Sequence, residues 1–273
     1  MTNRRMKIGI VGCGTIGSQL AQAIEQRFSS QAELFALCDI NNDKAKKIKA
    51  VSSLNPQIVS LDELIRVCDL VIEAASAQIS AEVAEKALGQ GKDVMLMSVG
   101  GILARAEELF SLARTKACHI FLPSGAIGGL DAVKAASMAR IKCATLITRK
   151  PPKGLIGAPY LAEKKIDLSS IKGETIIFEG LVTEAIKGFP KNVNVSAALS
   201  LAGVGAKETK VKIISSPDYK ANIHEIQVEG DFGKLLVRTE NAPSPANPKT
   251  SFLAALSAIA TLKGILDVVK IGT

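Results

Sequence analysis

The sequence predicts an α/β protein with a doubly wound parallel sheet at the N-terminus, followed by a second α+β domain that carries a mixed or antiparallel sheet. Over the first 123 residues, short apolar runs alternate with segments of helical periodicity. This alternation is typical of βαβ units, whose parallel sheet is covered by helices on both faces. From Glu174 onward, longer runs with alternating hydrophobicity favour strands of a second sheet. A chain of 273 residues is long enough to bury a core in each part.

The elements of the first part follow from its apolar pattern. The expected strands are short, apolar and often β-branched, and they cover residues 7–11, 34–38, 70–74, 94–97 and 119–122. The helices expected between them cover residues 18–27, 42–50, 81–88 and 104–115.

The second part begins with a glycine-rich segment that becomes helical, followed by a proline-containing breaker at residues 150–153. Its expected strands cover residues 176–178, 211–214, 224–228 and 234–239. Gly230-Asp-Phe-Gly233 predicts a hairpin turn, and three prolines predict a loop over residues 241–248. An apolar stripe then predicts a helix over residues 250–269.

Composition excludes several classes of protein. The net charge is +8, but the basic residues are scattered and aromatic residues make up only 4%, which disfavours binding to nucleic acid. The five cysteines are odd in number and form no CxxC pair, so neither a disulfide framework nor a thiolate zinc site is expected. No apolar stretch predicts a signal peptide or a membrane span. We expect a soluble cytoplasmic protein.

A glycine loop gives the strongest functional signal. Gly12-Cys-Gly-Thr-Ile-Gly17 follows a predicted strand, opens a helix, and precedes a second strand that ends at Asp39, 22 residues after Gly17. This is the Rossmann-type fingerprint of a dinucleotide site, in which glycines admit the pyrophosphate and the acid binds the ribose. The alternative is a ligand-free turn with Asp39 as a helix cap. The residues expected to contact the cofactor here are Gly12, Gly14, Thr15, Ile16, Gly17 and Asp39.

The acid at position 39 favours NAD, because a carboxylate repels the 2′-phosphate of NADP. NADP stays open as an alternative. Lys44, Lys46 and Lys47 lie just downstream and could reach that phosphate, although three lysines on one helix more often form a solvated face.

The second part offers candidates for substrate binding. Ser124 opens a glycine-rich turn before a helix, where backbone N–H groups can meet a carboxylate. Lys191, Asn192 and Asn194 lie near the start of an alanine-rich helix, where helix capping by asparagine is the competing interpretation. Thr250 and Ser251 open the last predicted helix, and simple N-capping is the favoured interpretation of both.

Of the two histidines, His224 is the candidate for proton transfer. His119 lies in an apolar run and is expected to pack there, whereas His224 begins an alternating strand. An ordinary imidazole pKa of about 6.5 suits acid–base chemistry near neutral pH. Residue pattern alone favours a structural role for a lone strand histidine. No cluster of ligands predicts a metal site, and Cys13 is expected to pack inside the glycine loop.

Five segments together resemble those of the L-aspartate dehydrogenase family. They are GCGTIG, SGAIGGLDA, FPKNVNVSAALSLAG, NIHEIQVEGDFG and NPKTSFLAALS, and they occur in the family's order over nearly the whole chain. The resemblance implies oxidation of L-aspartate with NAD(P) and water to oxaloacetate and ammonia through iminoaspartate, which can feed NAD biosynthesis. It also implies a homodimer or higher oligomer.

The resemblance implies roles for particular residues. The family's active-site histidine falls on His224, and its cofactor contacts fall on Ala126 and on an asparagine of the pair Asn192 and Asn194, with Asn194 favoured. The resemblance implies a Rossmann domain and a second α+β domain, and the change of pattern after Pro123 places the dinucleotide-binding domain at residues 1–123, completed by the C-terminal helix 250–273. Residues 124–249 would then bind substrate and form the oligomer. The physiological direction of the reaction stays open.

Rival families differ from this chain in the motifs that they carry. A dihydrodipicolinate reductase would carry paired histidines, which this chain lacks, and a semialdehyde dehydrogenase would need a loop cysteine, whereas Cys143 lies in a predicted strand. A homoserine dehydrogenase and a dinucleotide-binding protein without turnover remain alternatives.

Overall fold

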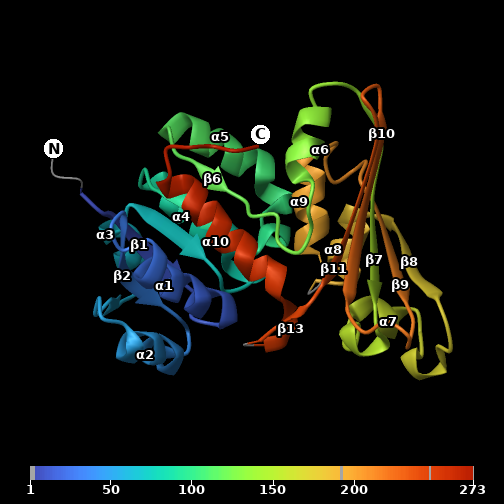
Figure 1. The fold of residues 1–273 in the computed structure, drawn as a ribbon, viewed down its shortest axis with the longest axis horizontal. Helices are drawn as coiled ribbons and strands as arrows, with labels where there is room; N and C mark the ends of the chain where they lie inside the picture. The colour runs from blue at the N-terminus through green and yellow to red at the C-terminus, as the bar shows by residue number, and fades with distance from the viewer. Residues whose placement is uncertain (1–3, 191–192, 246, 273) are drawn as a thin grey trace. The chain divides into compact units, whose positions relative to one another are not determined.

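The computed structural model describes residues 4–190, 193–245 and 247–272, and the chain divides into two compact units. Unit 1 extends to Pro123 and includes Ala255–Lys270, and unit 2 is built from Ser124–Ala254 with the residues from Ile271. Figure 1 shows the elements of each unit. Lys191, Asn192 and Ala246 lie outside the described residues.

Unit 1 is built on a parallel sheet with the strand order β3-β2-β1-β4-β5-β6. Its strands are β1 (Met6–Val11), β2 (Ala32–Cys38), β3 (Gln57–Ile58), β4 (Leu70–Glu73), β5 (Asp93–Leu96) and β6 (Ile120–Phe121). The predicted doubly wound sheet is confirmed. This strand order places a topological switch between β1 and β4, where such sheets bind ligands beyond the carboxyl ends of the strands.

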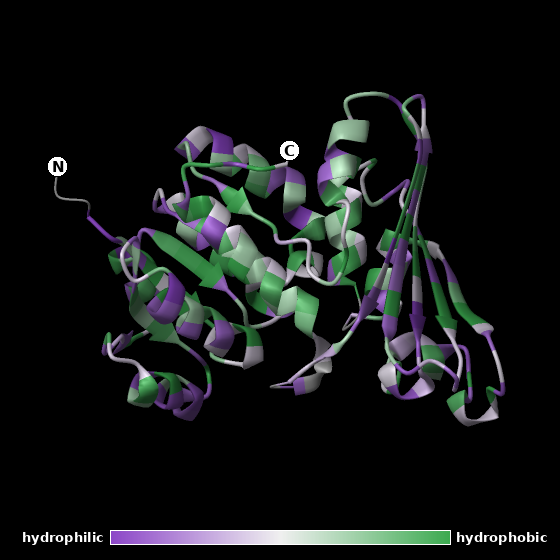
Figure 2. Ribbon diagram, in the orientation of Figure 1, coloured by the Kyte–Doolittle hydropathy of each residue, from purple (hydrophilic) through white to green (hydrophobic). Residues whose placement is uncertain are grey.

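Helices cover both faces of this sheet. They are α1 (Thr15–Arg27), α2 (Asn42–Val51), α3 (Leu61–Val67), α4 (Ala77–Gly89), α5 (Ala106–Lys116) and α10 (Phe252–Leu266). Ile8 and Ile10 of β1 pack in one cluster with residues of α1, α2 and α10. Gly9 faces the opposite side of the sheet, where an added Cβ would meet Leu64 of α3. Figure 2 shows the hydrophobic residues gathered in these strands and along α10.

Unit 2 contains a mixed sheet with the strand order β11-β10-β7-β9-β8, in which β7 and β9 are parallel and the other pairs antiparallel. Its strands are β7 (Ile141–Lys150), β8 (Thr175–Leu181), β9 (Lys210–Ser215), β10 (Asn222–Gly230) and β11 (Gly233–Asn241). The predicted hairpin is present, since Gly230 pairs with Gly233.

The helices of unit 2 pack mainly on one face of that sheet. They are α6 (Leu130–Ala136), α7 (Pro159–Glu163), α8 (Val182–Gly188) and α9 (Asn194–Ala202). Val133 of α6 and Leu199 of α9 share a buried cluster with Leu146 of β7 and Ile226 of β10. Burying a side chain of this size stabilises the fold by about 1.5–3 kcal/mol. No helix in the described part of the chain is long and apolar enough to cross a membrane.

Two predictions near the C-terminus are wrong. The expected loop 241–248 contains strand β12 (Pro243–Ser244), which pairs with β13 (Asn247–Ser251). The last helix begins at Phe252, not at Thr250, because the chain up to Ser251 is held in that ribbon and the Phe252 N–H donates to the Ala242 carbonyl at 2.9 Å. Prolines suit short ribbons at an edge, where their missing N–H costs nothing.

Candidate functional site

The glycine loop has two glycines that its packing requires. Gly12 has φ +96°, and a Cβ there would lie 2.5 Å from the Ala75 nitrogen, so the turn admits no side chain. A Cβ at Gly17 would overlap the Gly12 carbonyl oxygen. These two positions therefore bring the first turn of α1 directly against β1 and the β4–α4 connection.

Gly14 is open to the outside of the loop. It is the N-cap residue of α1, and a Cβ built on it would meet nothing within 4 Å. No packing requirement explains a glycine here, whereas close approach of a pyrophosphate does. Thr15 and Ile16 form the first turn of α1, which has no acidic residue, so the positive end of the helix dipole faces this space. The loop therefore fits a dinucleotide phosphate group.

Asp39 lies directly beside the loop, as its spacing predicts. Its Oδ2 accepts a hydrogen bond of 2.6 Å from the Cys13 N–H, and its Oδ1 accepts one of 2.7 Å from the Asn41 N–H. Each carboxylate oxygen keeps a lone pair for a ribose hydroxyl. Burial, followed by the Asp39 carboxylate, raises the pKa of the Cys13 thiol to about 12, and this thiol packs in the core as predicted.

Glu73 is a buried carboxylate that the sequence did not single out. It ends β4 with no exposed surface, and it accepts hydrogen bonds from the N–H groups of Ala75 (2.8 Å), Ser76 (3.0 Å) and Ser98 (3.0 Å) and from the Ser98 hydroxyl (2.9 Å). Burial raises its pKa. Glu73 thereby fixes the segment against which Gly12 packs, so it positions the loop.

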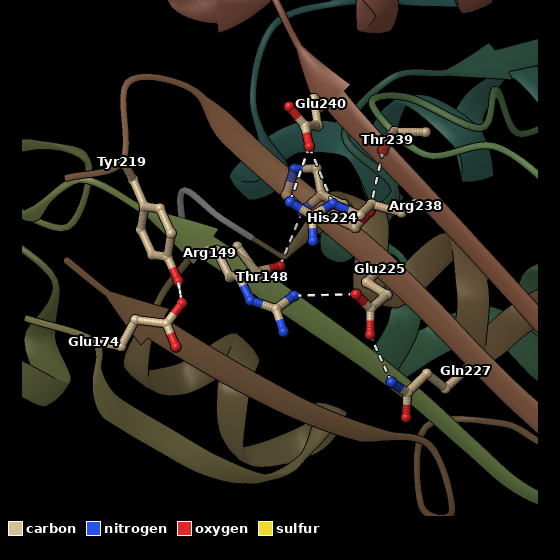
Figure 3. A network of polar contacts seen from close by, with 10 residues as sticks. All are labelled: Thr148, Arg149, Glu174, Tyr219, His224, Glu225, Gln227, Arg238, Thr239 and Glu240. Carbon is tan, nitrogen blue, oxygen red and sulfur yellow. Dashed lines mark hydrogen bonds and ion pairs between the residues drawn. The ribbon is translucent and has the colours of Figure 1, made fainter.

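His224 lies on β10 in unit 2 and is 4% exposed. Its Nδ1 is 2.9 Å from the Thr148 hydroxyl of β7, the residue with which it pairs across the two strands (Figure 3). Burial, assisted by the charge of Lys150, lowers the pKa of His224 to about 3. The expectation of an ordinary imidazole pKa is therefore wrong for this state, because the ring has lost its hydration and lies near a cation.

Lys150 is the second residue that sequence reasoning missed. It ends β7 two positions after Thr148, so both side chains project from the same face of the sheet. It is 8% exposed, and burial lowers its pKa to about 8. Arg149 between them points to the opposite face, where it forms an ion pair of 3.3 Å with Glu225 (Figure 3).

The glycine-rich turn of unit 2 is tied to the strand beside His224. The Ala126 carbonyl accepts hydrogen bonds from the Thr239 hydroxyl (3.0 Å) and from the Asn241 amide (3.1 Å) of β11. Thr239 pairs with His224, and its hydroxyl also lies 3.3 Å from the His224 carbonyl oxygen. The structure thus brings Ala126, which the family resemblance assigned to the cofactor, to the strand pair that holds the histidine.

The remaining predicted residues are placed as follows. Ser124 is half-buried ahead of that turn, and Asn194 is the first residue of α9, whose N-cap is Val193, so the capping interpretation is wrong for Asn194. Thr250 lies in β13 and lines a cavity of about 810 Å³ within unit 2. Lys191 and Asn192 lie outside the described residues.

Comparisons with known proteins cover nearly the whole chain. Residues 131–265 match a family model described as the C-terminal part of aspartate dehydrogenase, and residues 12–123 match the NAD-binding domain of homoserine dehydrogenase. The curated L-aspartate dehydrogenase of Methanosarcina acetivorans is 50% identical over 98% of this chain and 100% of that protein. The chain belongs to the L-aspartate dehydrogenase family. An L-aspartate dehydrogenase of Methanococcus maripaludis is 42% identical with the same coverage.

Solved structures agree with this membership. The aspartate dehydrogenase of Thermotoga maritima has a TM-score of 0.75 and 28% identity, and the match covers 98% of this chain and 100% of that one. A homoserine dehydrogenase of Thiobacillus denitrificans, at 14% identity and a TM-score of 0.62 over 96% of this chain and 73% of that one, shares the fold alone. The predicted family, the enzyme class of NAD(P)-dependent oxidoreductases and the cofactor class are confirmed.

Proposed function

We propose that this chain catalyses the reversible oxidative deamination of L-aspartate, with NAD(P) as the oxidant, to oxaloacetate and ammonia through iminoaspartate. The observation that carries the proposal is the buried His224, which Thr148 holds on the same sheet face from which Lys150 lines a cavity of unit 2, in a member of this family. The cavity suits an anionic substrate, and the imidazole suits proton transfer. In the same proposal, the imino acid supplies NAD biosynthesis, and the enzyme works as a homo-oligomer.

The cofactor belongs to unit 1 in this proposal. The loop Gly12–Gly17 would hold the pyrophosphate at the start of α1, and Asp39 would bind the adenosine ribose and favour NAD over NADP. When bound, NAD accepts the hydride that leaves Cα of aspartate. Ala126 and Asn194 are proposed as further contacts of the cofactor.

Proton transfer falls to His224. Because Nδ1 is held by the Thr148 hydroxyl, Nε2 is the ring nitrogen that meets the substrate amine or the water that hydrolyses the imine. His224 would take a proton from the amine while hydride leaves Cα, which leaves the iminium, and then assist the attack of water that releases ammonia. Ser124, Lys191, Asn192 and Thr250 are proposed as contacts of the substrate.

Absorbance of the reduced nicotinamide, recorded with L-aspartate, with homoserine and without substrate, tests this function. We expect reduction with L-aspartate alone, and His224→Ala should lower turnover about 10²–10⁴-fold while binding of NAD persists. Reduction with homoserine only would assign the chain to the rival dehydrogenase. Binding of NAD without reduction in any mixture would contradict catalysis.

A further inference from the structure

An ion pair joins the two strands that hold His224. Arg149 of β7 directly follows Thr148, and Glu225 of β10 directly follows His224. Nη1 of Arg149 donates to Oε2 of Glu225 at 3.3 Å, as Figure 3 shows. Because side chains alternate along a strand, this ion pair lies on the face of the sheet opposite to His224 and Thr148. The ion pair and the histidine contact therefore link the same two strands from opposite faces.

The register of β7 and β10 determines both contacts. His224 pairs with Thr148, and Arg149 pairs with Ile223, so Arg149 and Glu225 are diagonal neighbours across the two strands. Diagonal neighbours in an antiparallel sheet lie about 7–8 Å apart, within reach of long side chains. A shift of one residue would turn every side chain of β10 to the other face. Such a shift would separate His224 from Thr148 and Glu225 from Arg149 together.

Apolar packing on the inner face ends just before His224. The buried cluster of unit 2 contains the cross-strand pair of Leu146 and Ile226. The next pair on that face is Thr148 and His224, and both side chains are polar. Burial of apolar side chains is what specifies register most strongly in a sheet. At the end of the strands that carries His224, the ion pair on the outer face is therefore an additional link.

This ion pair is well shielded from water. The side chains of Arg149 and Glu225 are 19% and 12% exposed, and Oε1 of Glu225 accepts a hydrogen bond of 2.6 Å from the Gln227 amide. At the other end of β7, Lys142 and Asp231 form an ion pair whose side chains are 57% and 54% exposed. Solvent screens the exposed pair more strongly. We expect the shielded pair to hold its strands more firmly.

We propose that the ion pair of Arg149 and Glu225 positions His224, by keeping β7 and β10 in the register that places Nδ1 on the Thr148 hydroxyl and leaves Nε2 to transfer the proton. Both are positioning residues, since they lie on the opposite face of the sheet and act through the strands. The effect on turnover rests on the proposed function of His224, whereas the effect on the state of the imidazole ring does not.

Loss of the ion pair should affect the chemical step more than binding. Without it, the ends of the two strands are free to shift, and the ring of His224 would leave the Thr148 hydroxyl for part of the time. A displacement of about 1 Å in a catalytic group can lower a rate about 100-fold. Because neither charged side chain shares a face with His224, we expect the substrate and the cofactor to bind almost as in wild type.

Steady-state kinetics of the full chain with L-aspartate and NAD test this split. Arg149→Met and Glu225→Gln remove one charge each at similar side-chain length. Each should lower kcat about 10–100-fold, with KM for L-aspartate and affinity for NAD within about twofold of wild type. The double variant should lose no more than either single variant, because the two residues act as one pair. Arg149→Lys keeps the charge and should recover most of kcat.

Nitrogen-15 NMR of the imidazole rings reads the position of His224 directly. The chain has two histidines, so spectra of His119→Gln assign the signals. The ring of His224 is neutral at pH 7.5, because its pKa lies at about 3. In wild type we expect a single tautomer with the proton on Nδ1, which donates to Thr148. Arg149→Met and Glu225→Gln should show a mixture of both tautomers.

Lys142→Met is the matched control, because it breaks the exposed ion pair with Asp231 on the same strand. It should keep the wild-type kcat and a single tautomer. All spectra and rates are recorded below the melting transition seen by circular dichroism. If neither neutral variant folds, Glu225→Asp shortens the carboxylate by one carbon and should show a smaller change of the same kind in kcat and tautomer.

A merely structural role of the ion pair predicts lower melting temperatures with unchanged kcat and an unchanged tautomer. That result, or losses of kcat that multiply in the double variant, would overturn the proposal. The proposed function fails separately. If wild type does not oxidise L-aspartate, that function is wrong, but the tautomer measurement still decides the role of the pair. If wild type does so and the variants keep its kcat and tautomer, the function stands and this inference fails.

Discussion

Acidification should destabilise this protein through one buried side chain, His224. Its pKa of about 3 in the folded state lies well below the value of about 6.5 expected in the unfolded chain. Below pH 6.5 the His224 side chain becomes protonated in the unfolded chain but stays neutral in the folded chain. The stabilising contribution is therefore complete above pH 6.5 and is lost as the pH falls toward 3.

The size of this effect follows from the displacement of the pKa. One pH unit corresponds to about 1.4 kcal/mol, so lowering the pH from 6.5 to 5.0 should cost about 2 kcal/mol of unfolding free energy. The full displacement gives a ceiling of about 5 kcal/mol near pH 3. Because the ring is only 4% exposed, screening by solvent does not reduce these figures substantially.

Urea unfolding followed by circular dichroism at pH 7.5 and pH 5.0 measures the effect. Wild type should lose about 2 kcal/mol more than His224→Gln between the two pH values. His119→Gln is the control, because its side chain is 70% exposed beside Asp93, and it should behave like wild type. Equal losses in wild type and His224→Gln would refute the reasoning, since they would mean that the folded protein protonates this ring as readily as the unfolded chain.

Four further predictions concern unit 1. Gly14→Val should melt at a temperature near that of wild type, because a Cβ there meets nothing within 4 Å, yet it should weaken NAD binding at least tenfold in a fluorescence titration. Gly17→Ala should instead lower the unfolding free energy by about 1–3 kcal/mol, because its Cβ would overlap a backbone carbonyl. Asp39→Ser should shift the ratio of NAD to NADP affinities toward NADP, and tighter binding of NADP than NAD by wild type would contradict the role of this carboxylate. Glu73→Gln should lower the unfolding free energy by about 1–3 kcal/mol in urea, because one amide NH₂ would face backbone N–H donors; wild-type stability would show that these bonds are dispensable.

The N-terminal unit was predictable because its signals are local. The turn at Gly12, the packing at Gly17 and the acid at Asp39 all lie within a single βαβ segment, and each is required by the backbone around it. Glu73 shows the limit of this reasoning. Its position at the end of a short apolar strand gives no sign in the sequence that its carboxylate is buried. Its partners at Ala75, Ser76 and Ser98 come from two different loops that only the fold brings together.

Strand β7 explains why the cavity of unit 2 was missed. Its buried positions are Ala144, Leu146, Thr148 and Lys150. Because two of these four residues are polar, the strand lacks the alternation of apolar and polar residues by which a half-buried strand is recognised in a sequence. Beside Pro151, a lysine at the end of such a run is typical of a solvated breaker. The hydroxyl at Thr148 could be understood only once its pairing with His224 was known.

The charge of Lys150 controls how readily His224 takes up a proton. Each side chain is desolvated, and the charge of Lys150 further disfavours the imidazolium, so the ring is a weak base in this structure. A dicarboxylate beside Lys150 would neutralise that charge and add negative charge of its own, which raises the pKa of both groups. In the proposed reaction, the same anion that is to be oxidised would thus make His224 a stronger base, and the proton would be taken up only when there is a substrate amine to release it.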